Sequence, residues 1–176
     1  MRFLKSPAPR KQPPIRPDGI ICEAQFSPCR TWRYSLRRTW AFGPHVMVIG
    51  LNPSTADELT DDPTVRRCIR FARFWGYGGL FMMNLFGWRA TDPRELRTAP
   101  DPIGVDNDRH LAEYARRASL VVYAWGNHGA LGHRGDSVIK MIDAIEGIAR
   151  PTCLGRTQSG HPKHPLYLKG DLVPIP

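Results

Sequence analysis

Four segments of the sequence place polar or glycine residues directly after a short apolar run. They are Gly50-Leu51-Asn52-Pro53, Asn84-Leu85-Phe86, Trp125-Gly126-Asn127-His128 and the loop from Gly155 to Leu166. An asparagine amide carries an acceptor and two donors, so it can hold a water molecule or read the edge of a base. A histidine can donate a hydrogen bond or a proton near neutral pH. Asn52, Asn84 and a histidine of the last segment are therefore candidate functional residues, although both asparagines also suit plain turns.

The segment that begins at Gly50 matches neither of two common phosphate-binding motifs. It lacks the Gly-Lys-Ser/Thr ending of a Walker A motif and the spacing of the dinucleotide-binding fingerprint. Pro53 has no N–H, which weakens a phosphate cradle, so a rigid turn that aims Asn52 at a ligand is the better interpretation. Ser54 and Thr55 lack the strand-turn-helix elbow of serine hydrolases, and we do not expect either to be a nucleophile.

Two histidines, His161 and His164, stand next to prolines in the last segment. A His-Pro step in an extended loop holds the imidazole rigidly, and either histidine could serve as the donor. Metal ligation would need a third ligand, and none stands nearby at a suitable spacing. We therefore expect neither a metal ion nor another cofactor.

The elements that must position these residues alternate along the chain. Continuous apolar runs at 46–49, 80–83, 120–123 and 152–154 predict buried strands. Apolar residues at helical spacing predict helices after Asp62, after Asp106 and near 138–145. This order predicts an α/β protein, a three-layer α/β/α sandwich with a mainly parallel, four-stranded central sheet. Ligands bind at the carboxyl ends of the strands in such sheets, where the candidate residues fall.

The N-terminal part of the chain differs in composition. Residues 1–19 contain five prolines and few large apolar residues, so we expect a flexible arm there and a single α/β domain over residues 20–176. Between 20 and 40, Tyr34 and Leu36 alternate with Arg33 and Arg37. This alternation predicts an additional strand or hairpin with its arginines facing outward.

The 176 residues carry a formal net charge of +9, and 20 of the 25 basic residues are arginine. Residues 1–40 hold nine basic and two acidic residues, a net charge of +7. Arginine suits phosphates and stacks on bases, so this end is either a nucleic-acid footprint or a solvated tail. No apolar run approaches 18 residues, and prolines occupy the place of a signal-peptide core, so we expect a cytoplasmic protein without a spanning helix.

The motifs as a group resemble a known family. They are Leu51-Asn52-Pro53-Ser54-Thr55-Ala56, Asp61-Asp62-Pro63-Thr64, Arg66-Arg67-Cys68, Asn84-Leu85-Phe86, Arg89-Ala90-Thr91-Asp92-Pro93, Trp125-Gly126 and His164-Pro165-Leu166-Tyr167-Leu168. Together they resemble the DUF1643 family of unknown function from bacteria and phages, from about Arg30 to the C-terminus. More distantly, the order of the motifs is similar to that of the uracil-DNA glycosylase superfamily, which implies the fold of that superfamily.

The second resemblance implies a catalytic pair. Asn52 would orient the hydrolytic water, at a position where the most active branch of the superfamily has Asp. His164, with His161 as the competing choice, would stabilise the leaving base.

The same resemblance implies binding roles. Asn84 and Trp125 would bind the flipped base, beside the turn formed by Gly50 and Pro53. Leu166 or Tyr167 would enter the duplex as a wedge, and a basic set would hold DNA, namely Lys163, Arg33, Arg37 and Arg38.

These likenesses lead us to expect a DNA glycosylase-like enzyme that hydrolyses the N-glycosidic bond of a flipped uracil or modified base, with DNA as its partner. Two alternatives stay open. The first is a nucleic-acid-binding module of the same fold without catalysis. The second is an enzyme acting on a small nucleotide or sugar phosphate, because Gly126, Gly129 and Gly132 either admit a ligand close to the backbone or form a tight turn beside Trp125.

Overall fold

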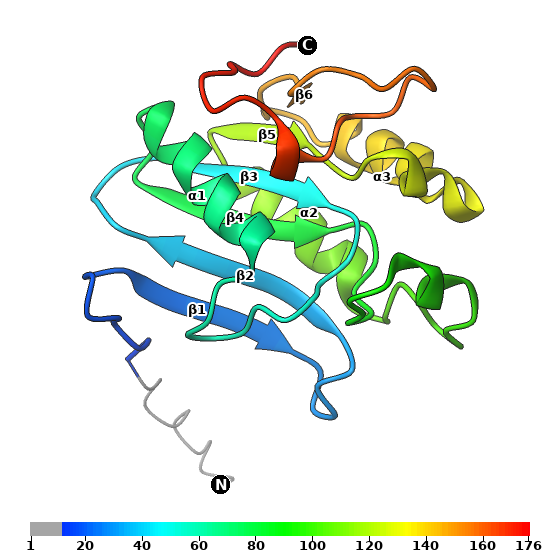
Figure 1. Ribbon diagram of the computed structural model, residues 1–176, viewed down its shortest axis with the longest axis horizontal. Coiled ribbons are helices and arrows are strands. Elements are labelled where there is room, and N and C mark those ends of the chain that lie inside the picture. The colour runs from blue at the N-terminus through cyan, green and yellow to red at the C-terminus, as the bar shows by residue number, and fades with distance from the viewer. Residues whose placement is uncertain (1–11) are drawn as a thin grey trace, which may run out of the picture.

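One sheet organises the fold (Figure 1). The computed structural model describes residues 12–176, and six strands pair there in the order β1-β2-β4-β3-β5-β6. Neighbouring strands among β4, β3, β5 and β6 are parallel, whereas β1 and β2 pair in antiparallel register. The strands are β1 (Ile21–Phe26), β2 (Arg33–Thr39), β3 (His45–Gly50), β4 (Gly79–Asn84), β5 (Leu120–Tyr123) and β6 (Thr152–Cys153).

The six-stranded sheet is mixed, which corrects the prediction of a mainly parallel, four-stranded central sheet with an additional N-terminal strand or hairpin. The hairpin of β1 and β2 joins the sheet through β2, where Leu36 lies opposite Met82 of β4. This pairing covers the edge that β4 would otherwise leave without hydrogen-bond partners. Alternation within a strand reports which faces are buried and does not indicate which neighbour the strand joins. The α/β class of the fold is confirmed.

Helices cover both faces of the sheet (Figure 1). On one face α1 (Pro63–Phe74) packs over a cluster that includes Val48 and Met82. On the other face α2 (Asn107–Arg117) and α3 (Arg134–Asp143) pack over a cluster that includes Met47 and Met83. Successive strand residues point to opposite faces, so each strand feeds both clusters. Three short 3-10 helices complete the chain, η1 (Pro93–Arg97), η2 (Asn127–His133) and η3 (Pro165–Tyr167).

The start of α1 is set by local chemistry. Asp62 precedes the helix, and its carboxylate accepts a 2.8 Å hydrogen bond from the backbone N–H of Val65. Pro63 occupies the first helical position, where a missing N–H costs nothing. This capping fixes the first turn of α1 beside the carboxyl ends of β3 and β4.

Residues 1–11 of the predicted arm, which spans residues 1–19, lie outside the described residues. The stretch 14–19 folds back on the domain. Ile15 bridges to Ile21, the carbonyl of Pro14 accepts from the N–H of Cys22 at 2.9 Å, and Arg16 pairs with Asp61. These contacts attach the chain to the sheet from Pro14 onward.

The arginines of β2 do not face outward as the alternation predicted. Arg33 and Arg38 are buried, with 1% and 0% of their surface exposed, and Arg37 is half-buried beside Glu23 at 3.0 Å. Arg38 binds the Asp61 carboxylate at 2.8 Å and the backbone carbonyl of Asp57 at 2.7 Å. Carbonyls and a carboxylate from the loop between β3 and α1 replace the water that a buried guanidinium loses. Single-residue alternation cannot reveal such a partner.

Within the described part of the chain, no helix combines the length and apolar composition required to cross a membrane.

Candidate functional site

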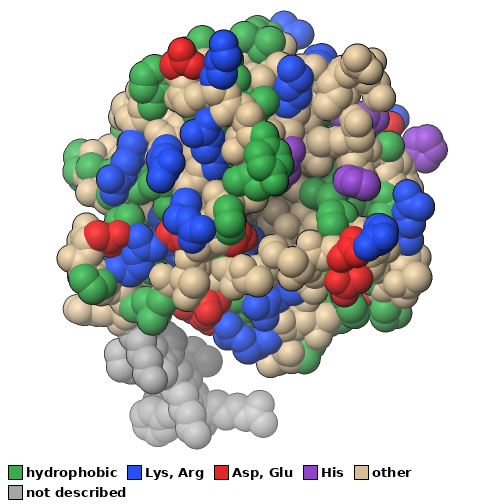
Figure 2. Space-filling model, in the orientation of Figure 1, with side chains coloured by type: hydrophobic (Ala, Val, Ile, Leu, Met, Phe, Trp, Pro, Cys, Tyr) green, Lys and Arg blue, Asp and Glu red, His purple; other side chains and the backbone are tan. Residues whose placement is uncertain are grey.

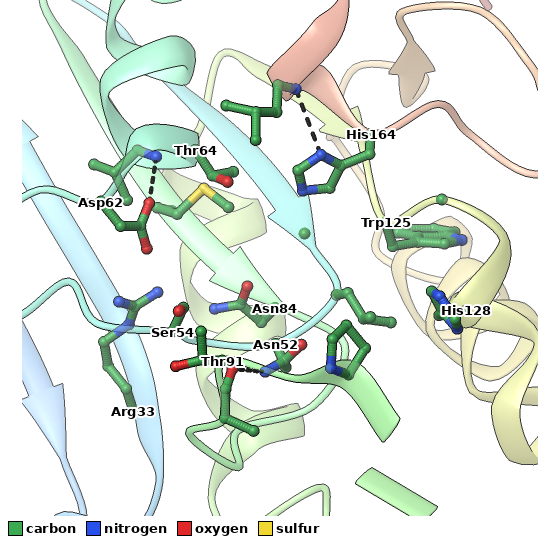
Figure 3. A pocket seen from close by; sticks show the side chains of 18 of the residues that line it. Arg33, Asn52, Ser54, Asp62, Thr64, Asn84, Thr91, Trp125, His128 and His164 are labelled. Atoms are coloured by element: carbon green, nitrogen blue, oxygen red, sulfur yellow. Dashed lines mark hydrogen bonds between the residues drawn. The ribbon is translucent and has the colours of Figure 1, made fainter. Parts of the chain in front are cut away.

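The carboxyl ends of β3, β4 and β5 open into a cavity of about 560 Å³ (Figure 3). This size falls in the range of small-molecule sites, roughly 300–1,000 Å³. Asn52 enters from the turn after β3, Asn84 from the end of β4, and His164 from the C-terminal loop. Sequence reasoning placed these three residues at one rim, and all three line the same cavity. The other predicted site residues that line it are Gly50, Trp125, Leu166, Tyr167 and Arg33.

The amide of Asn52 is held in one orientation. Its nitrogen donates to the backbone carbonyl of Ala90 at 2.7 Å and to that of Pro53 at 3.0 Å. The backbone N–H of Ala90 also donates to the carbonyl of Pro53, at 2.9 Å. Both N–H donors of the amide are therefore used, and the amide oxygen is left as an acceptor. An acceptor fixed in this way can orient the hydrogen of a water molecule.

Asn84 closes the floor of the cavity and is 2% exposed. Arg33 only donates, so the amide atom that faces it must be the oxygen, turned over from the way Figure 3 draws it. The oxygen then accepts from Nη2 of Arg33 at 3.3 Å, and the nitrogen donates to the carbonyl of Met83 at 3.1 Å. One N–H and one lone pair of Asn84 stay free for a ligand.

Arg33 brings a buried positive charge to the wall of the cavity. Its Nη1 donates to the carbonyl of Ala56 at 2.9 Å, while its Nε has no hydrogen-bond partner. Burial lowers the pKa of Arg33 to about 10, and the negative charge of Asp62 opposes that shift. The guanidinium remains charged at neutral pH, and its hydrogen bond fixes the orientation of the Asn84 amide.

His164 is carried by a loop that is tied to the end of β5. The N–H of Gly126 donates to the carbonyl of Pro162 at 2.8 Å, and the N–H of Lys163 donates to the carbonyl of Gly155 at 2.9 Å. Nδ1 of His164 accepts from the N–H of Leu166 at 3.4 Å, which leaves Nε2 as the protonated nitrogen that faces the cavity (Figure 3). Burial lowers the pKa of His164, with the charge of Asp62 acting in the opposite direction.

Some predicted site residues lie outside the cavity. Pro53 and Lys163 are not among its lining residues, and neither is His161, so the geometry favours His164 over His161 as the donor. Arg37 and Arg38 also lie elsewhere. Arg38 is fully buried on Asp61, which corrects its assignment as a phosphate ligand, whereas Arg37 is half-buried beside Glu23 and its contact with DNA stays a prediction.

The sequence profile of the DUF1643 family, described as a protein of unknown function, matches residues 33–166. The chain belongs to the DUF1643 family. No curated protein and no solved structure matches it. In this DUF1643 protein the matched region begins with Arg33 in β2 and ends with Leu166 in η3. The cavity therefore belongs to the family region, and of the predicted residues that line it only Tyr167 falls outside.

Sequence reasoning missed several residues that line the cavity of this DUF1643 protein. Asp62, which the sequence placed only at the start of a helix, both caps α1 and faces the cavity. The further hydroxyl and imidazole groups are Ser54, Thr64, Thr91 and His128. The positions of Asp62 and Thr64 at the start of a predicted helix could have placed them at the site, because the first turn of a helix that follows a parallel strand begins at the ligand-binding edge.

The glycine-rich turn after β5 contacts other parts of the protein through its backbone and its close packing. Trp125 is 2% exposed, and a methyl group added at Gly129 would come within 2.1 Å of its ring. The N–H groups of Gly126 and Gly129 donate to the carbonyls of Pro162 and Gly126. Gly129 therefore serves the packing of Trp125, and the N–H groups of Gly126 and Gly129 are both used by backbone carbonyls.

Over residues 12–176, no three His, Cys, Asp or Glu side chains are grouped closely enough to hold a metal ion.

Gly50 keeps the floor of the cavity open. A methyl group at this position would lie 2.8 Å from Cε of Met82 and 3.1 Å from the Asn84 amide. We expect Gly50→Ala to lower the free energy of unfolding by about 1–3 kcal/mol, because the neighbouring side chains must shift to make room. Urea denaturation measures this cost. Gly170→Ala is the matched control, since a methyl group there meets only Arg67 at 3.6 Å, and equal costs for the two variants would contradict the prediction.

Acid is expected to destabilise the fold through buried histidines. Burial lowers the pKa values of His45, His110 and His164 in the folded state, whereas the unfolded chain titrates near 6.5. Below that pH the unfolded state binds more protons, so stability falls as pH falls, by at most about 1.4 kcal/mol per histidine and pH unit.

Urea denaturation at pH 7, 6 and 5 checks this dependence. His110→Gln should reduce the change in the free energy of unfolding between pH 7 and pH 5. His133→Asn, at an exposed side chain, should leave that change as it is in the wild type. A stability that is constant or rises toward pH 5 would be inconsistent with neutral buried imidazoles.

Proposed function

We propose that this DUF1643 protein hydrolyses the N-glycosidic bond of a nucleotide flipped out of DNA. The observation that carries the proposal is the convergence of Asn52, Asn84 and His164, from three distant segments, on one cavity at the carboxyl ends of parallel strands. Their chemistry divides into the three tasks of such a reaction, which are recognition of the base, orientation of water and stabilisation of the leaving group.

Base recognition falls to Asn84. Its free N–H and free lone pair match a base edge on which a carbonyl adjoins an N–H, as in uracil and its 5-substituted derivatives. Gly50 and Trp125 form the adjoining wall. Extrusion of the nucleotide costs a few kcal/mol, which contacts of this kind must offset.

Hydrolysis then uses Asn52 and His164. As the bond to the base lengthens, positive charge grows on the sugar and negative charge on the departing base. The Nε2–H of His164 can donate to that base, and the donation strengthens only as the charge develops. Asn52 accepts a hydrogen bond from the water that attacks the sugar carbon. The base leaves with the bonding electrons and takes up a proton, and the water loses one, so the products are the free base and an abasic sugar.

The proposal includes the finer classification of the fold. The parallel order β4-β3-β5-β6 and the helices on both faces support a three-layer sandwich of the uracil-DNA glycosylase type, extended by β1 and β2. Leu166 and the 91% exposed Tyr167 stand at the rim of the cavity, where a wedge would enter the duplex. All four cysteines are free thiols, which suits the cytoplasm, the compartment we propose.

Formation of abasic sites tests the proposal. The protein is incubated with duplexes and single strands that carry uracil, hydroxymethyluracil or mismatched thymine, and strand scission in alkali is scored. We expect scission with at least one substrate and its loss in Asn52→Ala. A folded protein that binds DNA and yields no abasic site on any substrate would overturn the proposal.

A carboxylate at position 52 is expected to be harmful. The Asn52 nitrogen donates to two backbone carbonyls, and an Asp oxygen in its place would face the same carbonyls without a hydrogen to offer. We expect Asn52→Asp to lower the free energy of unfolding by about 1–3 kcal/mol and not to increase the rate. Urea denaturation and the scission assay measure the two effects. A faster and equally stable variant would show that the amide does not fix this turn.

A second candidate, DNA binding without catalysis, is favoured by one observation. The amide of Asn52 stays uncharged and supplies no general base behind the sugar. In that case the wild type binds DNA, forms no abasic site, and His164→Ala leaves the affinity unchanged.

A further inference from the structure

The outward face of α1 is a continuous basic surface. Its apolar residues point to the sheet, and four arginines occupy the opposite side at helical spacing. They are Arg66, Arg67, Arg70 and Arg73, here called the α1 arginine face. The helix Pro63–Phe74 contains no acidic residue. Because residues three and four apart are neighbours on a helix surface, the four guanidinium groups lie along one side of α1.

The charge of this face is not neutralised by carboxylates. Arg66 and Arg67 donate to the backbone carbonyls of Asp61 and Leu168, and Arg73 lies over the ring of Trp40 at 5.2 Å. Within residues 12–176, none of the four arginines forms a salt bridge. By contrast, Arg109 and Arg117 on α2 pair with Asp106 and Glu113. A row of unpaired arginines attracts anions.

The basic surface adjoins the cavity. Thr64 and Val65 in the first turn of α1 line the cavity, and η3, which carries Leu166 and Tyr167, packs against the same helix. Figure 2 shows lysine and arginine side chains grouped over α1, to the left of the hollow at the centre of the view. A strand that places one nucleotide in the cavity would extend along this helix.

We propose that the α1 arginine face binds the phosphate backbone of the strand whose nucleotide enters the cavity. The inference rests on the proposed function, which supplies the flipped nucleotide. Arg66 and Arg73 are separated by about 10 Å along the helix, at about 1.5 Å per residue. A DNA strand carries one phosphate per 3.4 Å of axis, so the face spans about three phosphates. The planar fork of arginine fits phosphate oxygens in pairs.

Nucleic acid fits this surface better than an anionic membrane does. A helix that binds a membrane inserts an exposed apolar face between lipids. The apolar residues of α1 are buried in the core, including Val65, Ile69 and Phe71. Only Phe74, at the far end of the helix, exposes a large apolar side chain. The face therefore offers charge without an insertion surface.

Salt-dependent DNA binding tests the inference. The dissociation constant of a labelled 20-nucleotide single strand and of its duplex is measured at several NaCl concentrations. Arg70→Gln/Arg73→Gln spares the two arginines that hold backbone carbonyls. We expect this variant to reduce the slope of log affinity against log salt by about two, and to weaken binding by about tenfold or more near physiological salt.

Arg109→Gln/Arg116→Gln is the matched control, because it removes the same charge from exposed positions on α2, on the opposite face of the sheet. Thermal unfolding checks that both variants are folded. An unchanged slope in the α1 variant, an equal loss in the α2 control, or binding to phosphatidylserine vesicles in place of DNA would overturn the inference.

The outcomes separate this inference from the proposed function. A reduced slope in the α1 variant, together with no abasic site from the wild type, supports the binding face and rejects hydrolysis. Abasic sites from the wild type, with an unchanged slope in the α1 variant, support hydrolysis and reject the face.

Discussion

Replacing His164 by Ala is expected to lower the rate of base release by about 10²–10³-fold, the usual cost of removing one donor to a developing anion. Nε2 of His164 faces the cavity, and its Nδ1 is occupied by the N–H of Leu166. In the proposed reaction the donor acts on the departing base and contributes little before the bond lengthens, so the affinity for DNA is expected to stay close to that of the wild type. Single-turnover kinetics on the best substrate separate the two quantities.

The pH profile and a matched variant sharpen this prediction. Because burial lowers the pKa of His164, the imidazole is neutral at pH 7 and above, and the rate should not show its titration there. His161→Ala is the control, since His161 does not line the cavity. If His161→Ala lost the rate and His164→Ala kept it, the assignment of the donor would be reversed.

Arg38→Met is expected to lower the free energy of unfolding by about 3–5 kcal/mol, as in other buried pairs that lose one partner. Arg38 is 0% exposed and binds Asp61 at 2.8 Å, together with the carbonyl of Asp57 at 2.7 Å. Its loss leaves a buried carboxylate with Arg16 alone and releases the loop between β3 and α1, which carries Asn52. Urea denaturation measures the stability, and the rate of abasic-site formation measures the effect on the site.

Two further variants show whether the cost comes from the uncompensated charge. Arg38→Met/Asp61→Leu removes both charges and should recover much of the stability. Arg37→Met breaks the half-exposed pair with Glu23, worth about 0–1 kcal/mol. Equal costs for Arg37→Met and Arg38→Met would contradict a structural role for the buried pair.

The position of the cavity could be predicted because it depends on where each buried strand ends, and the sequence of a single strand shows that point. A continuous apolar run indicates a strand covered on both faces, and the residue that ends it lies at the carboxyl edge. Asn84, directly after such a run, and Asn52, three residues beyond one, were found in this way. His164 lies outside any strand, and the family resemblance singled it out over His161.

The hidden arginines could not be predicted, because their burial depends on partners that are distant in the sequence. Arg38 binds a carboxylate and carbonyls some twenty residues away, and the two terminal nitrogens of Arg33 donate to Ala56 and Asn84. Alternation predicts that the side opposite Tyr34 and Leu36 is polar and exposed. The loop after β3 instead covers Arg33, and it also covers Arg38, which lies on the same side of β2 as Leu36, so that both charges are interior. The α1 arginine face was also missed, although Arg66, Arg70 and Arg73 stand at helical spacing in the sequence.

The tethered amide of Asn52 has a consequence for substrate range. In the proposed reaction this uncharged group stands behind the sugar and offers no counter-ion to the oxocarbenium character of the transition state, so we expect the rate to depend more heavily on how readily the base departs. Bases whose ring nitrogen is more acidic, such as uracils with electron-withdrawing 5-substituents, should be released fastest. Across a graded series of such bases, the logarithm of the rate should rise steeply with leaving-group acidity.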